Sequence, residues 1–361
     1  MTPFSRGFAA LALGGCVATV AIGAAAPDYK LEAVSANLVW GSYSSDETPV
    51  LRIRSGQSVE IETLALMGLS NDHPEQFFLD HHIPLDSPQV QKMIAVKKEL
   101  QAKGVSSAPL TGPIFVEGAE PGDTLEVRIL DIKSFTPFGV NVGNPGKGGI
   151  PDLVPRPYEK VIPFDLKRNV ALFLPGIEVP LRQFQGMMAV SPAPERGKLP
   201  MRPPYPDIGG NMDNKRLTKG ATVYFPVHVS GALFQVGDPH AAQGDGEVSQ
   251  SAIESSNVVT VQLIVRKDLH IKTVRAETPT HYIEIGLDPD LNVAMHSAIA
   301  ASVEFLQETK HLNFFDALSL CSVGVDYEVT EVVDATKGVH AMIPKSLFQT
   351  NEPYWYHPPA N

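Results

Sequence analysis

The residue types that could do chemistry concentrate in one stretch of this sequence, between residues 209 and 254. Its potential ligands and proton carriers are carboxylates, one imidazole and two side-chain amides: Asp213, Asp238, Asp245, Glu247, His240, Asn211 and Gln243. Glycines separate them and would let the backbone crowd against a ligand. Carboxylate and imidazole are the usual ligands of a divalent ion such as Zn²⁺. The stretch therefore predicts a metal centre in turn-rich sequence.

The segments that must position these residues alternate apolar and polar side chains, a pattern typical of strands. Strands are expected at residues 50–54, 59–64, 124–132, 258–265 and 280–287, with shorter ones near 161–174 and 177–181. Helical spacing and capping residues predict helices at 87–103, 291–307 and 313–324. The pattern favours a mainly β fold with α+β elements, and not alternating βα units.

Two regions lack a regular pattern. Residues 134–160 are rich in glycine and proline and are expected to form a connecting or lid loop. Residues 68–108, which include the helix predicted at 87–103, are expected to form a surface insertion. The insertion contains His73, His81 and His82 in a spacing that matches no metal-binding motif.

Composition is that of a soluble globular chain. The 361 residues are 43% hydrophobic and 19% charged, and 29 basic and 40 acidic residues give a formal net charge of -11. Nucleic-acid binding needs a basic stripe, and the sequence has none, so this partner class is excluded.

The first 26 residues are predicted to be a secretory signal peptide. A short basic segment ending at Arg6 precedes an apolar run of small residues, which is too weakly hydrophobic for a membrane anchor. We therefore expect export to the periplasm or the medium. The run Leu13-Gly14-Gly15-Cys16 resembles a lipobox, and lipidation at Cys16 is the alternative that would attach the protein to a membrane. Residues 27–361 are expected to form one catalytic region with room for two intimately packed subdomains.

Once the signal peptide is removed, Cys321 is the one remaining cysteine, so no disulfide within the chain is expected. Its apolar surroundings favour a buried small hydrophobe. A catalytic thiol is the alternative, and it needs an activating base nearby.

Several long motifs together resemble the acetamidase/formamidase family. They follow one another in the family's order: Leu110–Asp123, Gly209–Asp213, Pro226–Glu247 and Pro279–Leu291. The resemblance implies an amide hydrolase that acts on carbon–nitrogen bonds other than peptide bonds. It also implies a β-sandwich core with a few helices, a metal-dependent site and a homo-oligomer.

Two positions depart from the family pattern, which has a histidine before Trp-Gly near the N-terminus and another before the LTGP motif. This chain has Val39 and Ala108 there. If either histidine binds metal or acts as a base in the relatives, the metal affinity or activity of this chain is in question. His73, His81 or His82 are candidate substitutes.

The residues would support hydrolysis of a small linear amide of the formamide or acetamide kind. Asp213, Asp238 and His240 are the expected metal ligands; Asp238 and His240 share a face if the segment is extended. Glu247 is the expected general base, with Glu254 and Glu117 as alternatives. Asn211 and Gln243 would orient the substrate or stabilise an oxyanion, and His281 is a further catalytic candidate. Asp245 belongs to an Asp-Gly turn and is the weakest candidate.

Three other functions stay open at this stage. A lactam hydrolase would use the same residues with a different pocket. A non-catalytic periplasmic binding protein would hold a small molecule without releasing ammonia. A thiol hydrolase would use Cys321 and ignore chelators.

Overall fold

The structure is a computed structural model that describes residues 26–69, 73–105 and 108–349. Residues 1–25 of the predicted signal peptide, including Cys16, lie outside the described part. No helix of the described part is long and apolar enough to cross a membrane.

One large sheet contains nine strands, and their alternating sequences account for most of the predicted strands. Their order across the sheet is β1 (Tyr29–Leu31), β5 (Ser58–Thr63), β18 (Asn257–Arg266), β7 (Thr124–Ser134), β15 (Thr222–Pro226), β19 (Arg275–Glu277), β20 (His281–Asp288), β22 (Thr336–Pro344) and β21 (Asp326–Asp334). At its centre β18 pairs antiparallel with β7 over the whole length of β18. Alternate residues of β18 are buried, as expected for a strand that covers a core with one face.

The second sheet has eleven strands and contains the residues predicted to bind metal. Its main order is β11 (Ile177–Pro180), β10 (Val170–Leu174), β9 (Tyr158–Asp165), β8 (Phe138–Gly143), β17 (Ile253–Glu254), β16 (Phe234–Ala242), β12 (Phe184–Ala189) and β14 (Gly209–Asn211). β6 (Leu110–Glu117) pairs with β16, and in turn with β2 (Leu38–Val39) and β4 (Leu51–Arg54). A separate pair joins β3 (Ser42–Tyr43) to β13 (Leu199–Pro200).

The two sheets pack face to face over one large apolar core. The first sheet contributes residues such as Val127, Val223 and Val261, and the second contributes Met188 and Phe234; all are fully or almost fully buried. Burial of this apolar surface is the main stabilising term of such a sandwich. The mainly β fold that the sequence predicts is thus confirmed.

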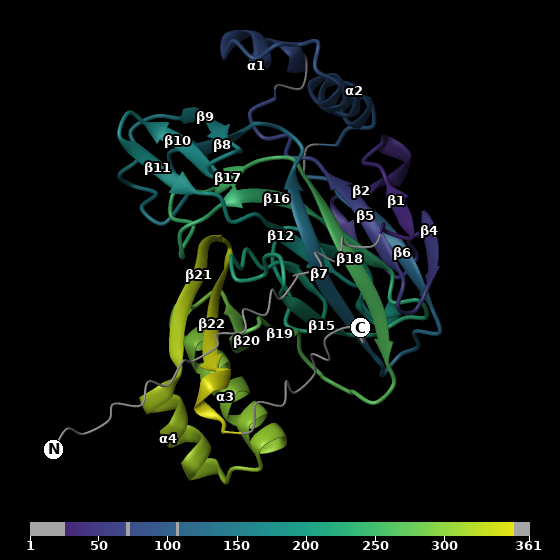
Figure 1. Cartoon of the computed structure of the whole chain (residues 1–361), viewed down its shortest axis with the longest axis vertical. Coiled ribbons are helices and arrows are strands. Elements are labelled where there is room, and N and C mark those ends of the chain that lie inside the picture. The colour runs from purple at the N-terminus through teal and green to yellow at the C-terminus, as the bar shows by residue number, and fades with distance from the viewer. Residues whose placement is uncertain (1–25, 70–72, 106–107, 350–361) are drawn as a thin grey trace, which may run out of the picture.

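The four α-helices of the described residues lie at the two ends of the sandwich (Figure 1). At one end are α1 (Pro74–Asp80) and α2 (Pro88–Ala102), which bury their own apolar cluster. At the other end α3 (Leu291–Lys310) and α4 (Phe314–Gly324) pack beside β20 and β22. The predicted helix starts are confirmed: the Ser87 side chain accepts from the amide of Val90, and Asp290 caps α3.

Two predictions about local structure are wrong. Residues 138–143 form β8, although they lie in the segment expected to be a loop. The reason is close packing: a Cβ at Gly139 would lie 2.5 Å from Ile253 Cγ2 and 2.8 Å from the carbonyl oxygen of Glu254, so this strand needs a residue that is typical of loops. The short helix α1 is also absent from the prediction, because seven residues starting at Pro74 give little periodic signal.

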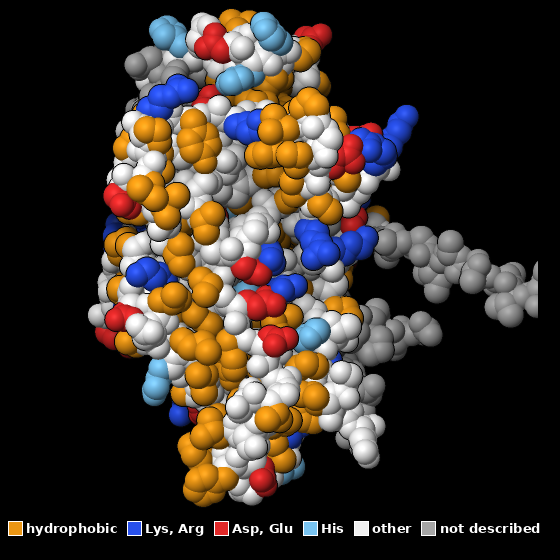
Figure 2. Space-filling view, turned by 90° about the vertical axis from the view of Figure 1, so that its left-hand side faces the viewer, with side chains coloured by type: hydrophobic (Ala, Val, Ile, Leu, Met, Phe, Trp, Pro, Cys, Tyr) orange, Lys and Arg blue, Asp and Glu red, His pale blue; other side chains and the backbone are white. Residues whose placement is uncertain are grey.

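The antiparallel strands β9, β10 and β11 form one edge of the second sheet (Figure 1). The face of the molecule that contains this edge is shown in Figure 2, with apolar side chains over much of its height and a mixture of acidic and basic side chains near its middle. Exposed apolar residues of the edge are Leu166, Leu172, Leu174 and Ile177.

Candidate metal centre and adjoining cavity

His240 lies in the middle of the second sheet, and its neighbours are set by strand register. On one side β12 places Phe184 opposite His240, and the two rings meet edge to face with centroids 4.9 Å apart. On the other side β17 places Glu254 opposite it. The side chain of His240 is 1% exposed, so every polar contact of the ring must come from the protein or from a bound ligand.

Gln243 determines which nitrogen of a neutral His240 carries the proton. Gln243 Nε2 donates to the backbone carbonyl of Asp213 at 2.7 Å, which leaves Oε1 to accept from His240 Nδ1 at 3.0 Å. An acceptor at that point requires the hydrogen on Nδ1. The free lone pair of the neutral imidazole therefore lies on Nε2.

Two acids face that lone pair. Asp238 Oδ2 is 3.5 Å and Glu254 Oε1 is 3.3 Å from His240 Nε2. Asp238 adopts a φ of 54°, which is uncommon outside glycine, and this local distortion of β16 accompanies the contact of Asp238 with His240. Ligand atoms of these three residues lie within 4.8 Å of one another, which is close enough to share one cation.

Asp213 approaches the same imidazole from the Nδ1 side, and Glu247 lies near both residues. Asp213 Oδ1 is 3.9 Å from His240 Nδ1, and ligand atoms of Asp213, His240 and Glu247 also lie within 4.8 Å of one another. Both acids are almost fully buried, yet Asp213 Oδ1 and Glu247 Oε2 have no hydrogen-bond partner in the structure. A buried acceptor without a partner costs about 1–3 kcal/mol, so these atoms point to a ligand that satisfies them.

Gly186 on β12 leaves space among these groups. A Cβ added there would lie 2.6 Å from Asp238 Oδ2 and 3.0 Å from His240 Cε1, and it would also clash with Asp213 Oδ1. Two side chains of β16 and Asp213, which follows β14, thus converge on one small space that any larger residue would fill.

Asp334 brings a fifth carboxylate from the far end of the chain. It ends β21, where the hairpin between β21 and β22 turns, and its Oδ2 accepts a hydrogen bond from Asn211 Nδ2. Arg202 Nε lies 3.7 Å from Asp334 Oδ1. Among the described residues, Arg202 is the one Lys or Arg within ion-pair distance of the five acids Asp213, Asp238, Glu247, Glu254 and Asp334.

The crowding of acids shifts their protonation. Burial, followed by the negative charges of Glu247 and Asp238, raises the pKa of Asp213 well above its ordinary value. Burial also raises the pKa of Glu247 far above its usual range, and raises the pKa values of Glu254 and Asp334. For His240, burial alone would lower the pKa, but Glu254 and Asp238 reverse this effect and hold it well above 6.5.

These observations fit a divalent cation. Five carboxyl groups and one imidazole carry too much negative charge to be buried as ions without a counter-charge, unless they take up protons. The free lone pair on Nε2, the unsatisfied oxygens and the space beside Gly186 would each be used by a bound ion. The donor set of carboxylate and imidazole is one that zinc accepts.

A further grouping of metal-ligand types is already neutralised. Asp245, Glu328 and His340 bring ligand atoms within 4.8 Å of one another. Lys215 Nζ lies 2.5 Å from Asp245 Oδ2, and Arg216 Nε donates to Glu328 Oε2 at 2.9 Å. These cations supply the counter-charge, so the grouping is an ion-pair network.

The structure brings together four of the residues predicted from the sequence: Asp213, Asp238, His240 and Glu247. Gln243 and Asn211 lie beside them, and the amide of Gln243 is occupied by protein groups on both sides. His281 instead hydrogen-bonds to Thr280 and faces charges of the Arg216 and Glu328 network.

The other candidate residues also have defined places. Asp245 belongs to the ion-pair network described above. His81 Nε2 is paired with Glu159 Oε1 at 3.0 Å. Cys321 is buried with a raised pKa, caused by burial, which disfavours a thiolate nucleophile.

The two positions that depart from the family pattern lie close to the metal centre along the sheet. Val39 pairs with Leu110, and Leu110 pairs with Gly237, the residue before Asp238. Ala108 lies two residues before Leu110.

Glu254 is expected from the sequence only as an alternative base, and three further residues of the site, Asp334, Gly186 and Tyr43, have no clear signal there. Glu254 faces His240 only through the pairing of β16 with β17, and Asp334 lies in an ordinary hairpin turn. Gly186 is a single glycine within an apolar strand. Tyr43 is fully buried with its hydroxyl unpartnered, and burial together with the charges of Asp238 and Asp213 raises its pKa.

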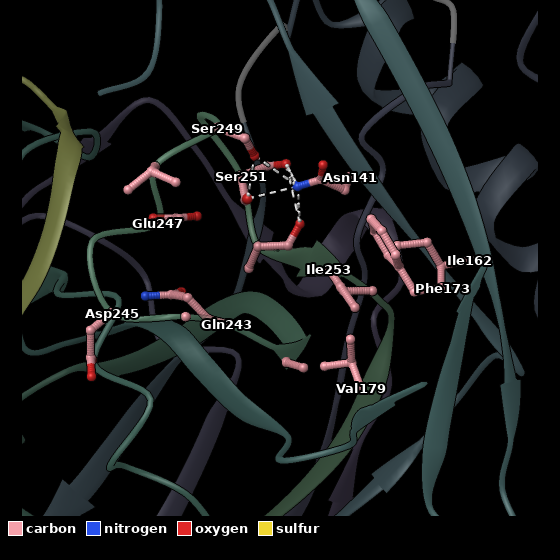
Figure 3. A pocket seen from close by; sticks show the side chains of 14 residues that line it. Asn141, Ile162, Phe173, Val179, Gln243, Asp245, Glu247, Ser249, Ser251 and Ile253 are labelled. Carbon is pink, nitrogen blue, oxygen red and sulfur yellow. Dashed lines mark hydrogen bonds between the residues drawn. The ribbon is translucent and has the colours of Figure 1, made fainter. Parts of the chain in front are cut away.

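A cavity of about 370 Å³ adjoins the acids. Glu247 and Gln243 line it on the side of the metal centre, and Ile162, Phe173 and Val179 line it on the opposite side (Figure 3). A small molecule in this cavity would therefore have one end near Glu247 and the other end against the strands β9 to β11.

The chain is similar to known proteins in sequence and in fold. The sequence pattern of the Acetamidase/Formamidase family matches residues 98–199 and 200–350. The acetamidase of Mycolicibacterium smegmatis is 27% identical over 230 residues, which cover 48% of this chain and 55% of that protein. The formamidase of Methylophilus methylotrophus is 26% identical over 312 residues, which cover 66% and 77%. The chain thus matches little more than half of the length of the acetamidase from Mycolicibacterium smegmatis.

The fold is shared with a solved relative. The crystal structure of an acetamidase from Bacillus halodurans has a TM-score of 0.73 and 27% identity, covering 90% of this chain and 99% of the other. Both the sequence pattern and the three-dimensional arrangement therefore extend over most of the described residues. This chain belongs to the Acetamidase/Formamidase family.

Proposed function

We propose that this protein is a metal-dependent amidase that hydrolyses a linear amide to a carboxylate and ammonia. The observation that supports this most is the convergence of buried acids on the Nε2 side and the Nδ1 side of His240, next to a cavity that Glu247 lines. The relatives that bear the names acetamidase and formamidase support the reaction class.

Asp238, His240 and Glu254 would hold the ion, and Asp213 is the fourth candidate ligand. A bound Zn²⁺ would act as a Lewis acid that polarises the amide carbonyl and lowers the pKa of water towards about 7. Gln243 keeps the ring of His240 in the tautomer that a ligand at Nε2 requires, so we assign it a positioning role.

Glu247 would carry the proton. Water attacks the carbonyl carbon while a Glu247 oxygen accepts a proton from it, and the same carboxyl then gives the proton to the nitrogen as the carbon–nitrogen bond breaks. The carboxylate product keeps the oxygen from water and ammonia leaves. The unpartnered Oε2 of Glu247 and its place in the cavity wall suit this role.

Asn211 and Tyr43 are candidates for binding the amide. Asn211 Oδ1 and the Tyr43 hydroxyl are both buried without a partner. An acceptor such as Asn211 Oδ1 suits the NH₂ group of a primary amide, and a phenol donor suits its developing oxyanion. His281 is not part of this scheme, because its hydrogen-bond partner is Thr280.

The decisive experiment pairs metal analysis of the purified protein with ammonia release from acetamide and formamide. His240→Ala is expected to lose the metal and the activity together. Glu247→Gln keeps the shape of the side chain, so it should retain metal while the turnover rate falls about 10²- to 10⁴-fold. Bound metal and full turnover in both variants would refute the scheme.

The same assay separates the alternatives. A lactam hydrolase opens rings without releasing ammonia, and a binding protein retains an amide unchanged. A thiol hydrolase loses activity on alkylation of Cys321 and keeps it in the presence of a chelator.

Export and a homo-oligomeric state remain part of the proposal. Cell fractionation with mass spectrometry of the mature N-terminus tests cleavage near residue 26 against lipidation at Cys16, and light scattering measures the mass of the assembly. A mature chain that begins at Met1 would contradict export by a cleaved signal peptide.

A further inference from the structure

The cavity beside Glu247 has a polar end and an apolar end (Figure 3). Glu247 and Gln243 are at the polar end, next to the metal centre. Ile162, Phe173 and Val179, from β9, β10 and β11, are on the opposite side together with Ile253 of β17.

The polar side chains between the two ends are committed to the protein. Asn141 Nδ2 donates to Ser249 Oγ at 2.9 Å, to the carbonyl of Ser251 at 2.9 Å and to the carbonyl of Ala252 at 3.0 Å. Ser251 Oγ accepts from the backbone amide of Val142 at 2.9 Å. These groups do not need a ligand, so what the far part of the cavity offers is hydrocarbon surface.

The apolar wall is also held in place. Phe173 and Val179 are partly buried against a cluster that includes Ile162, Ala242 and Ile253. In the hairpin, Val179 pairs with Ala171, and Ala171 pairs in turn with Phe164 of β9, so the three strands form a continuous sheet edge. The wall is a regular part of the second sheet and presents a defined shape.

The volume of the cavity exceeds what the smallest amides need. At about 30 Å³ for each non-hydrogen atom, as in liquid water, 370 Å³ holds about a dozen such atoms. Formamide has three and acetamide has four, so either would leave most of the apolar wall in contact with water.

We propose that the preferred substrates are primary amides whose acyl group is a hydrocarbon chain of about four to six carbons. This inference rests on the proposed amidase function and adds the substrate class. The amide lies at the end of the cavity near Glu247, and the chain lies against Ile162, Phe173, Val179 and Ile253. Each methylene buried on that wall adds about 0.8 kcal/mol of binding, a factor of about four.

The test is a series of primary amides from formamide to hexanamide, assayed for ammonia release. We expect kcat/KM to rise about fourfold for each added methylene from acetamide to hexanamide. A value for acetamide equal to or above that for hexanamide would overturn the substrate class and leave the amidase function standing.

A pair of variants locates the selectivity. Val179→Phe places a larger ring in the wall and should lower the ratio of kcat/KM for hexanamide over acetamide at least tenfold. Leu172→Phe is the matched control on the neighbouring strand, because Leu172 is 37% exposed and does not line the cavity. An unchanged ratio in Val179→Phe, with the circular dichroism spectrum of the parent, would overturn the proposed position of the chain.

Binding measurements keep the two proposals distinguishable. Calorimetry with metal-loaded Glu247→Gln should show tighter binding of hexanamide than of acetamide without turnover. If the parent protein shows this preference but releases no ammonia from any amide, the amidase function fails and the specificity of the cavity stands. If the two amides bind equally, the inference about substrate class fails.

Discussion

At the scale of single residues, the proposed metal centre depends on the space beside Gly186. Asp213, Asp238 and His240 all approach the point where a Cβ would lie. A methyl group at this point would push apart the atoms that we propose to share one cation, because overpacking a packed interior costs about 1–3 kcal/mol. The strand itself, β12, would tolerate alanine by its φ and ψ angles, since Gly186 does not have a positive φ.

Gly186→Ala is therefore expected to lower metal affinity at least tenfold and to leave the protein folded. Competition with a chromophoric chelator measures the affinity, and circular dichroism checks the fold. Gly244→Ala is the matched control, because a Cβ at Gly244 meets nothing within 4 Å. Equal affinities for the two variants would show that the cation does not lie among these residues.

Gln243 gives a second prediction at this scale. Gln243→Leu removes the acceptor for His240 Nδ1, so the ring loses the bond that fixes its tautomer. Loss of such an outer partner commonly lowers metal affinity by about 10- to 100-fold. Gln243→Glu retains an acceptor oxygen and should preserve more of the affinity than Gln243→Leu. The two values come from the same chelator competition, and a reversed order would contradict the positioning role.

The sequence predicts the site residues that lie in one stretch. Asp213, Asp238, His240 and Glu247 stand out because acids, an imidazole and glycines rarely gather so densely without a reason. Their convergence depends on backbone conformations that are uncommon outside glycine: φ is 44° at Asp213, 54° at Asp238 and 47° at Glu247. Composition does not reveal such angles, and only the three-dimensional structure shows the side on which each acid lies.

At the scale of elements, the hairpin of β21 and β22 supports the site from outside. Its turn contributes Asp334, and its strands contribute Glu328 and His340, which bond to each other at 2.9 Å. The hydrogen bond from His340 and then that from Arg216 lower the pKa of Glu328 to about 2. Glu328 therefore helps to hold the hairpin against the loop that contains Arg216.

The pH dependence follows from that shift. The folded-state pKa of Glu328 lies below its usual value of 4.5, so its contribution to stability is fully present above pH 4.5 and is lost as the pH falls towards 2. Glu328→Gln should lower the free energy of unfolding by about 1–2 kcal/mol at pH 7, and by less at pH 3. Urea denaturation at the two pH values measures this difference.

Glu99→Gln is the control for Glu328→Gln, because Glu99 is an exposed residue of α2. It should leave the free energy of unfolding unchanged at both pH values. If Glu328→Gln lowers the free energy of unfolding equally at pH 3 and pH 7, then the Glu328 carboxylate does not stabilise the fold through its charge.

Strands and helices with a repeating pattern of apolar residues could be predicted from the sequence. Elements that form only through tertiary contacts could not. The long strand β18 and the helix α3 match their predicted ranges because their patterns repeat over many residues. β17 has two residues, yet it places Glu254 against His240. A pair of residues has no period, so this part of the site depends on tertiary pairing alone.

At the scale of the whole molecule, removal of the metal should destabilise the fold. The five acids at the centre come from separate segments, and without a cation their charges oppose one another or must take up protons. A ligand present at 1,000 times its Kd stabilises the folded state by about 4 kcal/mol. Treatment with a chelator at pH 7 is therefore expected to lower Tm by several degrees.

Differential scanning calorimetry measures this shift, and return of the metal should restore the original Tm. The His240→Ala variant provides the control, since it should melt at the same temperature with and without the chelator. If the chelator leaves the Tm of the parent protein unchanged, no structural cation is bound.

The distance in sequence between Gly186 and Asp334 has a consequence for how the protein would obtain the proposed ion. In the unfolded chain, during or after synthesis, the acids of this site are far apart. Each would then bind a metal ion no more tightly than a single exposed carboxylate does. Metal binding would thus follow folding. The geometry of the folded site would then determine which metal is bound. The relative affinities of metals for the unfolded chain would not.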